Sequence, residues 1–288
     1  MSDLPRAVRI VEVGPRDGLQ NQPKTLIVEQ KAEFIRLLGE AGLRDIEVAS
    51  FVHPQWVPQL ADADMLIPRL ATNSSIRYSA LVPNMKGLER ALRSGVKRIA
   101  IFTAASETFN RKNINMGISE SIEVFRPVVE RALAHGMSVR GYVSTCFVCP
   151  YEGAISKEKV SEVTRALFEL GVDEVSIGDT IGAATPLDVE DTVGHLVALF
   201  PASKLAMHFH DTYAMAIANV YASLRLGVTV FDSSTGGIGG CPYAPGATGN
   251  VATEKLVYLF DRLKVETGIS MARLQHAAQY IDAALKAA

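Results

Sequence analysis

Residues 157–179 read KEKVSEVTRALFELGVDEVSIGD, and this stretch contains the pattern that decides the fold. Lys157–Leu170 has the apolar spacing of a helix, and Gly171 follows it as the residue type that commonly ends one. Glu174–Ile177 is a short strand-like run that leads directly into the polar Asp179. A helix that runs into a strand in this way predicts parallel strands joined by right-handed crossovers.

The same unit recurs along the chain as alternating short strands and longer helices. The other strand-like runs are Val8–Val13, Asp45–Val48, Ile76–Val82, Arg98–Phe102, Val139–Val143, Lys204–Phe209 and Val228–Asp232. The other helical patterns are Ile27–Ala41, Asn84–Ser94, Glu120–His135, Leu187–Phe200, Ala214–Leu226, Ala252–Leu263 and Ser270–Leu285, with a shorter helix within Pro54–Leu70. This pattern predicts an α/β protein, a single (β/α)8 TIM barrel with additional C-terminal helices, occupying residues 1–288 as one domain.

An open, doubly wound sheet is the alternative architecture for alternating strands and helices. Such sheets commonly carry Gly-x-Gly-x-x-Gly after their first strand. Here the first strand leads into Gly14-Pro15-Arg16-Asp17-Gly18, which lacks that pattern, so the closed barrel is favoured.

The composition is that of an ordinary globular protein, with 48% hydrophobic and 21% charged residues, which excludes disorder, collagen and coiled coil. A net charge of −2 provides no global field for nucleic acid or an anionic membrane. No apolar run approaches the ~18 residues of a membrane span. The first strand begins near Val8, which leaves no room for a signal peptide. We therefore expect a cytoplasmic protein without nucleic-acid or membrane partners, forming a homodimer or a higher homo-oligomer.

Polar residues follow or interrupt several of the predicted strands. Chemistry in a (β/α)8 barrel takes place at the carboxyl ends of the strands, so these residues predict an active site on that rim. The candidates are Arg16, Asp17, Glu47, Asp179, His208, His210 and Asn250.

The sharpest of these signals is His208-x-His210 at the end of a predicted strand. A strand has a side-chain period of two, so both imidazoles face the same side, the mouth of the barrel. The simpler alternative is a pair of polar residues satisfied by their neighbours. With Asp17 and Asn250 on neighbouring strands, we expect a divalent metal site instead. Imidazole, carboxylate and amide ligands without a thiolate suit Mg²⁺ or Mn²⁺ better than structural zinc.

Arg16, Asp17 and Glu47 make a second set. Glu47 lies in an apolar run, where a carboxylate is costly to bury unless it is paired, and Arg16 is a natural partner. In an extended run, Arg16 and Asp17 are expected to point to opposite sides of the chain.

The three cysteines are too few for a disulfide framework and favour a reducing compartment. Cys146-x-x-Cys149 is expected to close a barrel strand, and we predict neither a metal nor a redox role for it. Cys241 differs because it lies in the glycine-rich segment 236–249, which is able to approach a ligand closely.

Two long motifs carry a resemblance to a known family. Residues 11–21, VEVGPRDGLQN, and residues 239–250, GGCPYAPGATGN, are similar to those of the 3-hydroxy-3-methylglutaryl-CoA lyases. Further matches are Ser50-Phe51-Val52, Asn113-Ile114-Asn115, Arg140–Ser144 and Cys149–Gly153, and the likeness runs from about residue 8 to residue 260. The family belongs to the metal-dependent TIM-barrel lyases named for an Asp-Arg-Glu trio, with a domain that resembles pyruvate carboxyltransferases.

The resemblance implies cleavage of 3-hydroxy-3-methylglutaryl-CoA, an acyl-CoA, to acetoacetate and acetyl-CoA, with leucine breakdown as the default pathway. It implies a Mg²⁺ or Mn²⁺ ion held by Asp17, His208, His210 and Asn250. It also implies Arg16 at the thioester carbonyl, Glu47 and Asp179 as supporting residues, and Cys241 on a mobile catalytic loop. Either His208 or Asp17 would take the first proton.

Three alternatives stay open. The first is a lyase for a longer 3-hydroxy-3-alkylglutaryl-CoA, such as the isohexenyl homologue, which would use the same catalytic residues. The second is a Claisen-condensing acyltransferase of the same metal-dependent group. Those enzymes usually carry a C-terminal regulatory domain, and the glycine-rich segment here fits the lyases better. The third is a metal-binding barrel without activity, which the intact set of polar residues speaks against.

Overall fold

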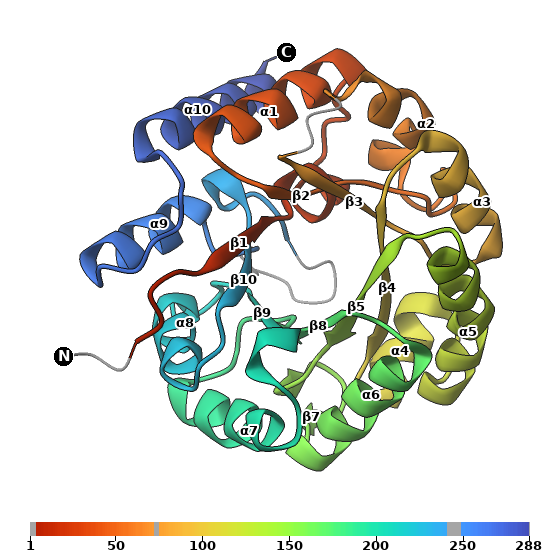
Figure 1. The fold of residues 1–288 in the computed structure, drawn as a ribbon, viewed down its shortest axis with the longest axis vertical. Helices are drawn as coiled ribbons and strands as arrows, with labels where there is room; N and C mark the ends of the chain where they lie inside the picture. Colours follow the sequence, from red (N-terminus) through yellow and green to blue (C-terminus); the bar gives the residue numbers. More distant parts are fainter. Residues whose placement is uncertain (1–3, 72–74, 241–248, 288) are drawn as a thin grey trace.

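A computed structural model describes residues 4–71, 75–240 and 249–287, and its centre is a closed barrel of eight parallel strands (Figure 1). The barrel strands are β1 (Arg9–Glu12), β2 (Asp45–Ser50), β3 (Arg77–Leu81), β4 (Arg98–Ala104), β5 (Ser138–Ser144), β8 (Glu174–Asp179), β9 (Leu205–Phe209) and β10 (Val230–Ser233). Around the barrel they follow the order β1-β10-β9-β8-β5-β4-β3-β2, so the first and last strands are neighbours. The predicted (β/α)8 architecture is confirmed.

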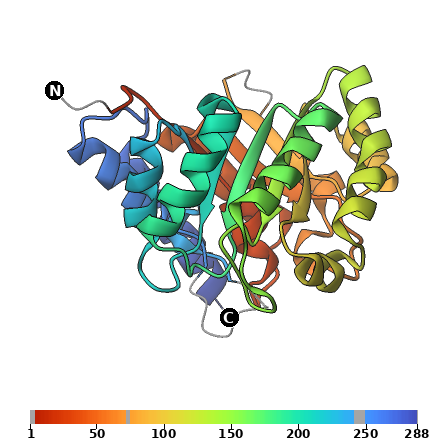
Figure 2. The ribbon, with the colours of Figure 1, turned by 90° about the horizontal axis from the view of Figure 1, so that it is seen from below.

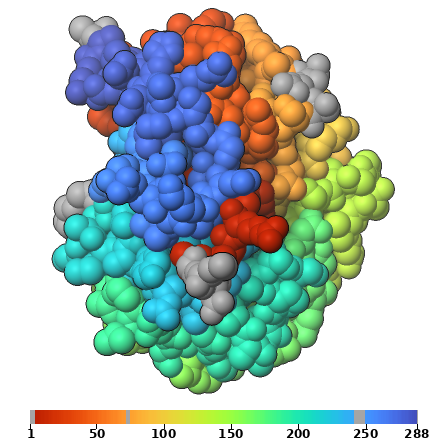
Figure 3. Space-filling view, turned by 60° about the vertical axis from the view of Figure 1, so that its left-hand side comes forward, coloured from red at the N-terminus to blue at the C-terminus, as the bar shows by residue number. Residues whose placement is uncertain are grey.

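The helices form a layer outside the strands (Figures 1 and 2). They are α1 (Val28–Ala41), α2 (Ala63–Leu66), α3 (Met85–Ser94), α4 (Glu107–Ile114), α5 (Ile118–Ala134), α6 (Lys157–Leu170), α7 (Pro186–Leu199), α8 (Ala216–Arg225), α9 (Thr253–Arg262) and α10 (Met271–Lys286). As predicted, α6 ends at a glycine in the left-handed region, Gly171 with φ 98°, and α1 ends in the same way at Gly42 with φ 108°. The last helix, α10, packs along the first helix, α1, on one side of the barrel (Figure 3).

Two elements were not predicted. Helix α4 has the sequence ETFNRKNI, which lacks an apolar stripe, and the cap that starts it is Ser106, whose side chain accepts a hydrogen bond from the Phe109 N–H. The strands β6 (Val148–Cys149) and β7 (Gly153–Ala154) form a small antiparallel hairpin apart from the barrel. Cys149 therefore lies in this hairpin, and the expectation that it closes a barrel strand is wrong.

The space between the strands and the helices is filled by apolar side chains. Phe34 and Leu38 of α1, Leu167 of α6 and Phe260 of α9 are all fully buried. Complete burial of one such side chain stabilises the fold by roughly 1.5–3 kcal/mol. We call this layer the apolar shell.

The inside of the barrel is different, because charged side chains fill much of it. Arg140 pairs with Glu174 at 3.0 Å and with Asp232 at 2.6 Å. Glu174 also accepts a hydrogen bond from Arg98 at 3.0 Å. We call this set of buried ion pairs the lumen network. Its side chains lie beneath the carboxyl ends of the strands, where the predicted active-site residues lie.

Across residues 4–71, 75–240 and 249–287, every helix is too short or too polar to cross a bilayer.

Candidate metal centre and active site

The chain turns sharply after β1, in the segment Gly14–Gly18. The backbone N–H groups of Arg16, Asp17 and Gly18 all donate to the carbonyl of Val13, at 3.1, 2.7 and 3.2 Å. This π-helical turn brings neighbouring side chains together, and Arg16 Nη1 donates to Asp17 Oδ1 at 2.6 Å. The expectation that Arg16 and Asp17 point to opposite sides is therefore wrong, because it assumed an extended chain.

The predicted pairing of Arg16 with Glu47 is confirmed. Arg16 Nε and Nη2 both lie 2.8 Å from Glu47 Oε2, and the Glu47 side chain is completely buried. Burial opposes the charge of Arg16, but the adjacent Glu47 and Asp17 carboxylates outweigh it and raise the Arg16 pKa above its ordinary value. Arg16 is therefore a cation held rigidly at the edge of the site.

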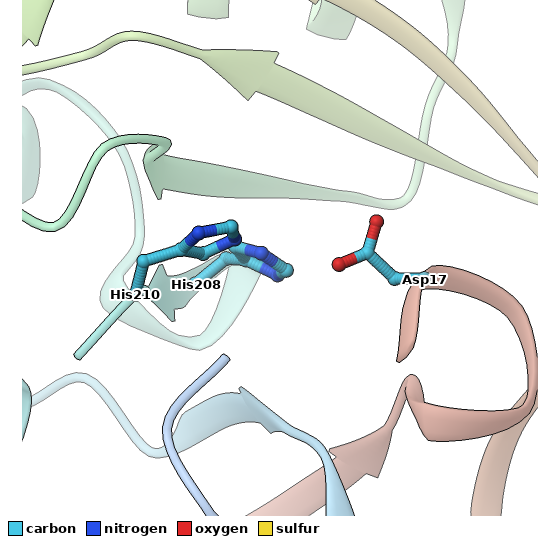
Figure 4. Close-up of side chains that lie close together, drawn as sticks. All are labelled: Asp17, His208 and His210. Atoms are coloured by element: carbon cyan, nitrogen blue, oxygen red, sulfur yellow. The ribbon is translucent and has the colours of Figure 1, made fainter. Parts of the chain in front are cut away.

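Asp17, His208 and His210 converge at the carboxyl ends of β1 and β9. One potential ligand atom from each residue lies within 4.8 Å of the others. Figure 4 shows both imidazoles on the side that faces the Asp17 carboxylate, with His208 nearer to it. Because His208 and His210 are two residues apart, they share this side, as the strand period predicts.

The protonation states of these residues suit a cation. Burial and the neighbouring His208 lower the pKa of His210 to about 4. Burial favours a higher pKa for Asp17, but Arg16, His208 and His210 lower it to about 2. At neutral pH the site therefore offers a carboxylate and an uncharged His210, which are the forms that bind metals.

One buried atom of the site lacks a partner. His210 Nδ1 has no hydrogen-bond partner among the described residues. A buried polar atom without a partner costs about 1–3 kcal/mol, a cost that coordination to a cation removes. Together with the oxygen and nitrogen donors of the group, this atom shows that the residues fit a divalent ion.

Asn250 joins the group from the other end of the chain. Its Nδ2 donates to Asp17 Oδ2 at 2.8 Å and to the Ile238 carbonyl at 3.4 Å. Its backbone also forms an isolated bridge with His210. All four residues predicted as metal ligands therefore lie together, with the Asn250 amide directed at the Asp17 carboxylate.

Asp179 lies at the end of β8 and faces the loop that follows. The N–H groups of Ala183 and Ala184 donate to its two carboxylate oxygens, each at 3.1 Å. Burial raises its pKa to about 6, and these two hydrogen bonds only partly oppose that shift. Asp179 is not part of the group that could hold a metal, so its contacts favour a supporting position.

The cysteines separate into two cases. Cys146 and Cys149 are buried, and burial raises the pKa of the Cys146 thiol well above its ordinary value. Cys241 lies outside the described residues, so its predicted place at the site is a prediction only.

A cavity of about 840 Å³ opens over the metal-capable residues. Its lining includes Arg16, Asp17, His208 and His210. It also includes the apolar side chains of Leu81, Phe102 and Phe125 and the cationic residues Arg111 and Lys112 of α4. Cavities of this size and mixed character are typical of sites for small molecules and cofactors.

Three residues were not predicted as functional, namely Tyr142, which lines this cavity, and Arg140 and Asp232, which contact residues that line it. Tyr142 lies between two guanidinium groups, with Arg16 5.6 Å and Arg140 5.0 Å from the centre of its ring. Asp232 on β10 contacts His208, with Oδ2 3.3 Å from Nδ1. For Arg140 and Asp232, the signal that could have identified them was the one used for Glu47, namely a charged residue within a buried strand.

Comparisons with known proteins agree with this geometry. Residues 7–281 match the HMGL-like family. The chain is 47% identical to a hydroxymethylglutaryl-CoA lyase of Bacillus subtilis, over 96% of this chain and 93% of that protein. It is 49% identical to a 3-hydroxy-3-isohexenylglutaryl-CoA/hydroxy-methylglutaryl-CoA lyase of Pseudomonas aeruginosa, over 98% and 94%. An HMG-CoA lyase from Acinetobacter baumannii, solved with coenzyme A and 3-methylmalate, superposes with a TM-score of 0.94 at 34% identity, covering 99% of this chain and 93% of that one.

Proposed function

The chain belongs to the HMGL-like family, and on this premise we propose that it is a divalent-metal-dependent carbon–carbon lyase. Its substrate is 3-hydroxy-3-methylglutaryl-CoA and its products are acetoacetate and acetyl-CoA. The observation that carries the proposal is the convergence of Asp17, His208 and His210 beside Arg16 in one cavity. The relatives that are 47% and 49% identical over nearly the full chain are both named as lyases of this kind.

Asp17, His208, His210 and Asn250 would hold the ion, which we propose to be Mg²⁺ or Mn²⁺. When bound, such an ion supplies Lewis acidity that lowers the pKa of an oxygen ligand and orients it. The buried Nδ1 of His210, which lacks a partner within the part of the chain that the structure describes, and the low pKa of Asp17 support this assignment.

The reaction is a retro-Claisen cleavage. The C3 hydroxyl loses its proton, the C2–C3 bond breaks, and the electron pair of that bond passes to the thioester as an enolate. C3 becomes the ketone of acetoacetate, and the enolate carbon takes up a proton to give acetyl-CoA. We assign the first proton transfer to Asp17 rather than to His208, because His208 would bind the ion through one ring nitrogen and its other nitrogen, Nδ1, lies 3.3 Å from Asp232 Oδ2.

Arg16 stabilises the charge that develops on the thioester oxygen. Its guanidinium is fixed by Glu47 and Asp17 before substrate binds, so no reorganisation is needed during the reaction. Because the oxygen carries full charge only near the transition state, this interaction favours the transition state over the ground state.

We assign the protonation of the enolate to Cys241, or to a group that acts together with it. The residue before it supports this assignment, because Gly240 lines the cavity and its carbonyl accepts a hydrogen bond from Asn21 Nδ2 at 2.9 Å. Asn250, which follows the segment, contacts Asp17. The chain thus enters and leaves the segment that carries Cys241 beside the metal-capable residues.

A second candidate substrate is a longer 3-hydroxy-3-alkylglutaryl-CoA. The Pseudomonas aeruginosa relative is named for both the isohexenyl and the methyl compound. The apolar side chains of Leu81, Phe102 and Phe125 in the lining would suit an alkyl chain. A role in leucine breakdown, a cytoplasmic location and a homo-oligomeric state are further proposals, and mammalian relatives of the chain are named as mitochondrial.

The test is an assay of purified protein with both acyl-CoAs, in the presence of Mg²⁺ or of a chelator. We expect acetoacetate from 3-hydroxy-3-methylglutaryl-CoA with the ion and none with the chelator. The Arg16→Gln variant should lose most of this activity, and Arg126→Gln, at an exposed position on α5, serves as its matched control. Absence of cleavage for both compounds would contradict the proposed function.

A further inference from the structure

A continuous series of buried hydrogen bonds runs beneath the site. Tyr142 Oη donates to Glu47 Oε2 and accepts from Arg140 Nη1, both at 3.1 Å. Arg140 Nη2 in turn donates to Asp232 Oδ1 at 2.6 Å. Because Glu47 holds Arg16, the series begins at the cationic edge of the active site.

The series ends at His208. Asp232 is completely buried, and its Oδ2 accepts from Ser176 Oγ at 2.8 Å and lies 3.3 Å from His208 Nδ1. Both oxygens of Asp232 are therefore occupied, one by Arg140 and the other by Ser176 and His208. The carboxylate is fixed in place before any ligand binds.

This arrangement sets the tautomer of His208. As the ion-pair partner of Arg140, the Asp232 carboxylate only accepts hydrogen bonds, so the hydrogen between the two groups belongs to His208 Nδ1. The other ring nitrogen, Nε2, then keeps its lone pair. A histidine that binds a metal through one nitrogen commonly donates from the other to a carboxylate.

We propose that Asp232 is a positioning residue, which holds His208 as the Nδ1–H tautomer with Nε2 free to bind the cation. The inference rests on the proposed metal centre and deepens it. Arg140 and Tyr142 continue the series of hydrogen bonds across the barrel to Glu47. One network therefore contacts both His208 and Arg16. The Tyr142 ring also meets the His208 ring edge-on, with their centres 6.3 Å apart.

The first test is Asp232→Asn, with Mn²⁺ affinity measured by electron paramagnetic resonance on metal-stripped protein without substrate. The amide oxygen would stay with Arg140, which donates, so the NH₂ group would face His208 Nδ1. His208 would then have to move its hydrogen to Nε2, as in the serine-protease variant whose Asp→Asn change traps the wrong tautomer. We expect Mn²⁺ to bind about 10–100-fold more weakly.

The matched control is Glu174→Gln. Glu174 is buried and pairs with Arg98 and Arg140 in the same network, but it has no contact with His208. Its loss should lower the melting temperature, because a buried ion pair is broken. It should leave the Mn²⁺ affinity within about twofold of wild type, because the contact between Asp232 and His208 is retained. Equal losses of affinity in both variants, or normal affinity in Asp232→Asn, would overturn the proposal.

A measurement on the wild-type protein covers the case in which Asp232→Asn fails to fold. Long-range ¹H–¹⁵N correlation spectra of ¹⁵N-histidine-labelled protein report the tautomer directly, and the His208 signals are assigned as those missing from His208→Gln. We expect the Nδ1–H form, and an Nε2–H form overturns the proposal. Neither measurement uses substrate, so an inactive protein that passes both would contradict the proposed lyase function alone.

Discussion

The apolar shell and the lumen network are both buried, yet they consist of opposite chemistry. The shell contains residues such as Leu38, Leu167 and Phe260, whereas the lumen contains Arg140 and Asp232. Apolar burial stabilises a fold in proportion to its area, without regard to direction. Buried ion pairs contribute little net stability, because the cost of removing charges from water offsets their attraction. The shell therefore accounts for stability, while the lumen accounts for the orientation of the active-site residues.

This difference predicts that substitutions at the active site reduce activity more than stability, and that substitutions in the apolar shell reduce stability more than activity. The largest effect on turnover should come from loss of the ion. A chelator should abolish activity, added Mg²⁺ or Mn²⁺ should restore it, and the metal-free protein should stay folded because the shell stays intact. Asp17→Ala and His208→Ala should each weaken metal binding in folded protein. Full activity in metal-free enzyme would contradict the site assignment.

Arg16→Gln should have the next largest effect. We expect kcat to fall about 10²–10³-fold, by analogy with the loss of one oxyanion-hole donor, with a much smaller rise in KM. Steady-state kinetics with Arg126→Gln alongside would measure this. A change dominated by KM would assign Arg16 to a ground-state carboxylate or phosphate instead.

The thiols provide a third test of the comparison. Cys146 and Cys149 are buried, so an alkylating reagent should modify Cys241 first and inactivate the enzyme, and bound acyl-CoA should slow the modification. Cys241→Ser should lower kcat strongly and leave the metal affinity nearly unchanged. Mass spectrometry locates the modified cysteine. Earlier labelling of Cys146, or a normal kcat for Cys241→Ser, would remove Cys241 from the mechanism.

A substitution in the apolar shell should lower the stability of the protein and leave its activity nearly unchanged. Leu167 of α6 is fully buried and packs against β5 at Gly141. Leu167→Ala should lower the free energy of unfolding by about 2–5 kcal/mol. The kcat of the folded enzyme should stay close to that of wild type, which urea unfolding and a parallel assay would establish. A large loss of kcat in folded Leu167→Ala would show that the shell also orients the site.

The smallest effect concerns Asp179, whose partners are backbone N–H groups rather than an arginine. Its pKa of about 6 in the folded protein lies above the ordinary value of 3.8, so the folded state binds the proton more tightly. This contribution is fully present below about pH 4 and is lost as the pH rises through 6, by up to ~3 kcal/mol. Asp179→Asn should remove this part of the pH dependence of the free energy of unfolding. Urea unfolding of both proteins at pH 4 and at pH 7 would measure it. The same change in unfolding free energy with pH in both proteins would contradict the raised pKa of Asp179.

The sequence predicted the fold and the site rim for a clear physical reason. Strand and helix periodicity are local properties that can be recognised in the sequence. Because the carboxyl ends of parallel strands lie on the same face, the proximity of His208, His210 and Asp17 could also be predicted. The contact between Arg16 and Asp17 was mispredicted because a π-helical turn leaves no periodic signal in five residues.

The lumen network escaped prediction for a different reason. Arg140, Glu174 and Asp232 lie on three different strands, and their pairing depends on the register with which the barrel closes. A charged residue in a buried strand indicates that a partner exists, as it did for Glu47. It does not indicate which strand supplies that partner.

The pairing of β1 with β10 has a consequence for the synthesis of the chain. β1 is made before the other strands of the barrel and its neighbour β10 is made after them, so one edge of β1 stays unpaired until β10 has been made. An unpaired edge is a template for association with other chains, and contacts this distant in sequence form slowly. In the same way, the face of α1 that contacts α10 stays uncovered until α10 has been made. Closure of this barrel therefore requires β10, and until β10 has been made the open edge of β1 is a site at which aggregation can begin.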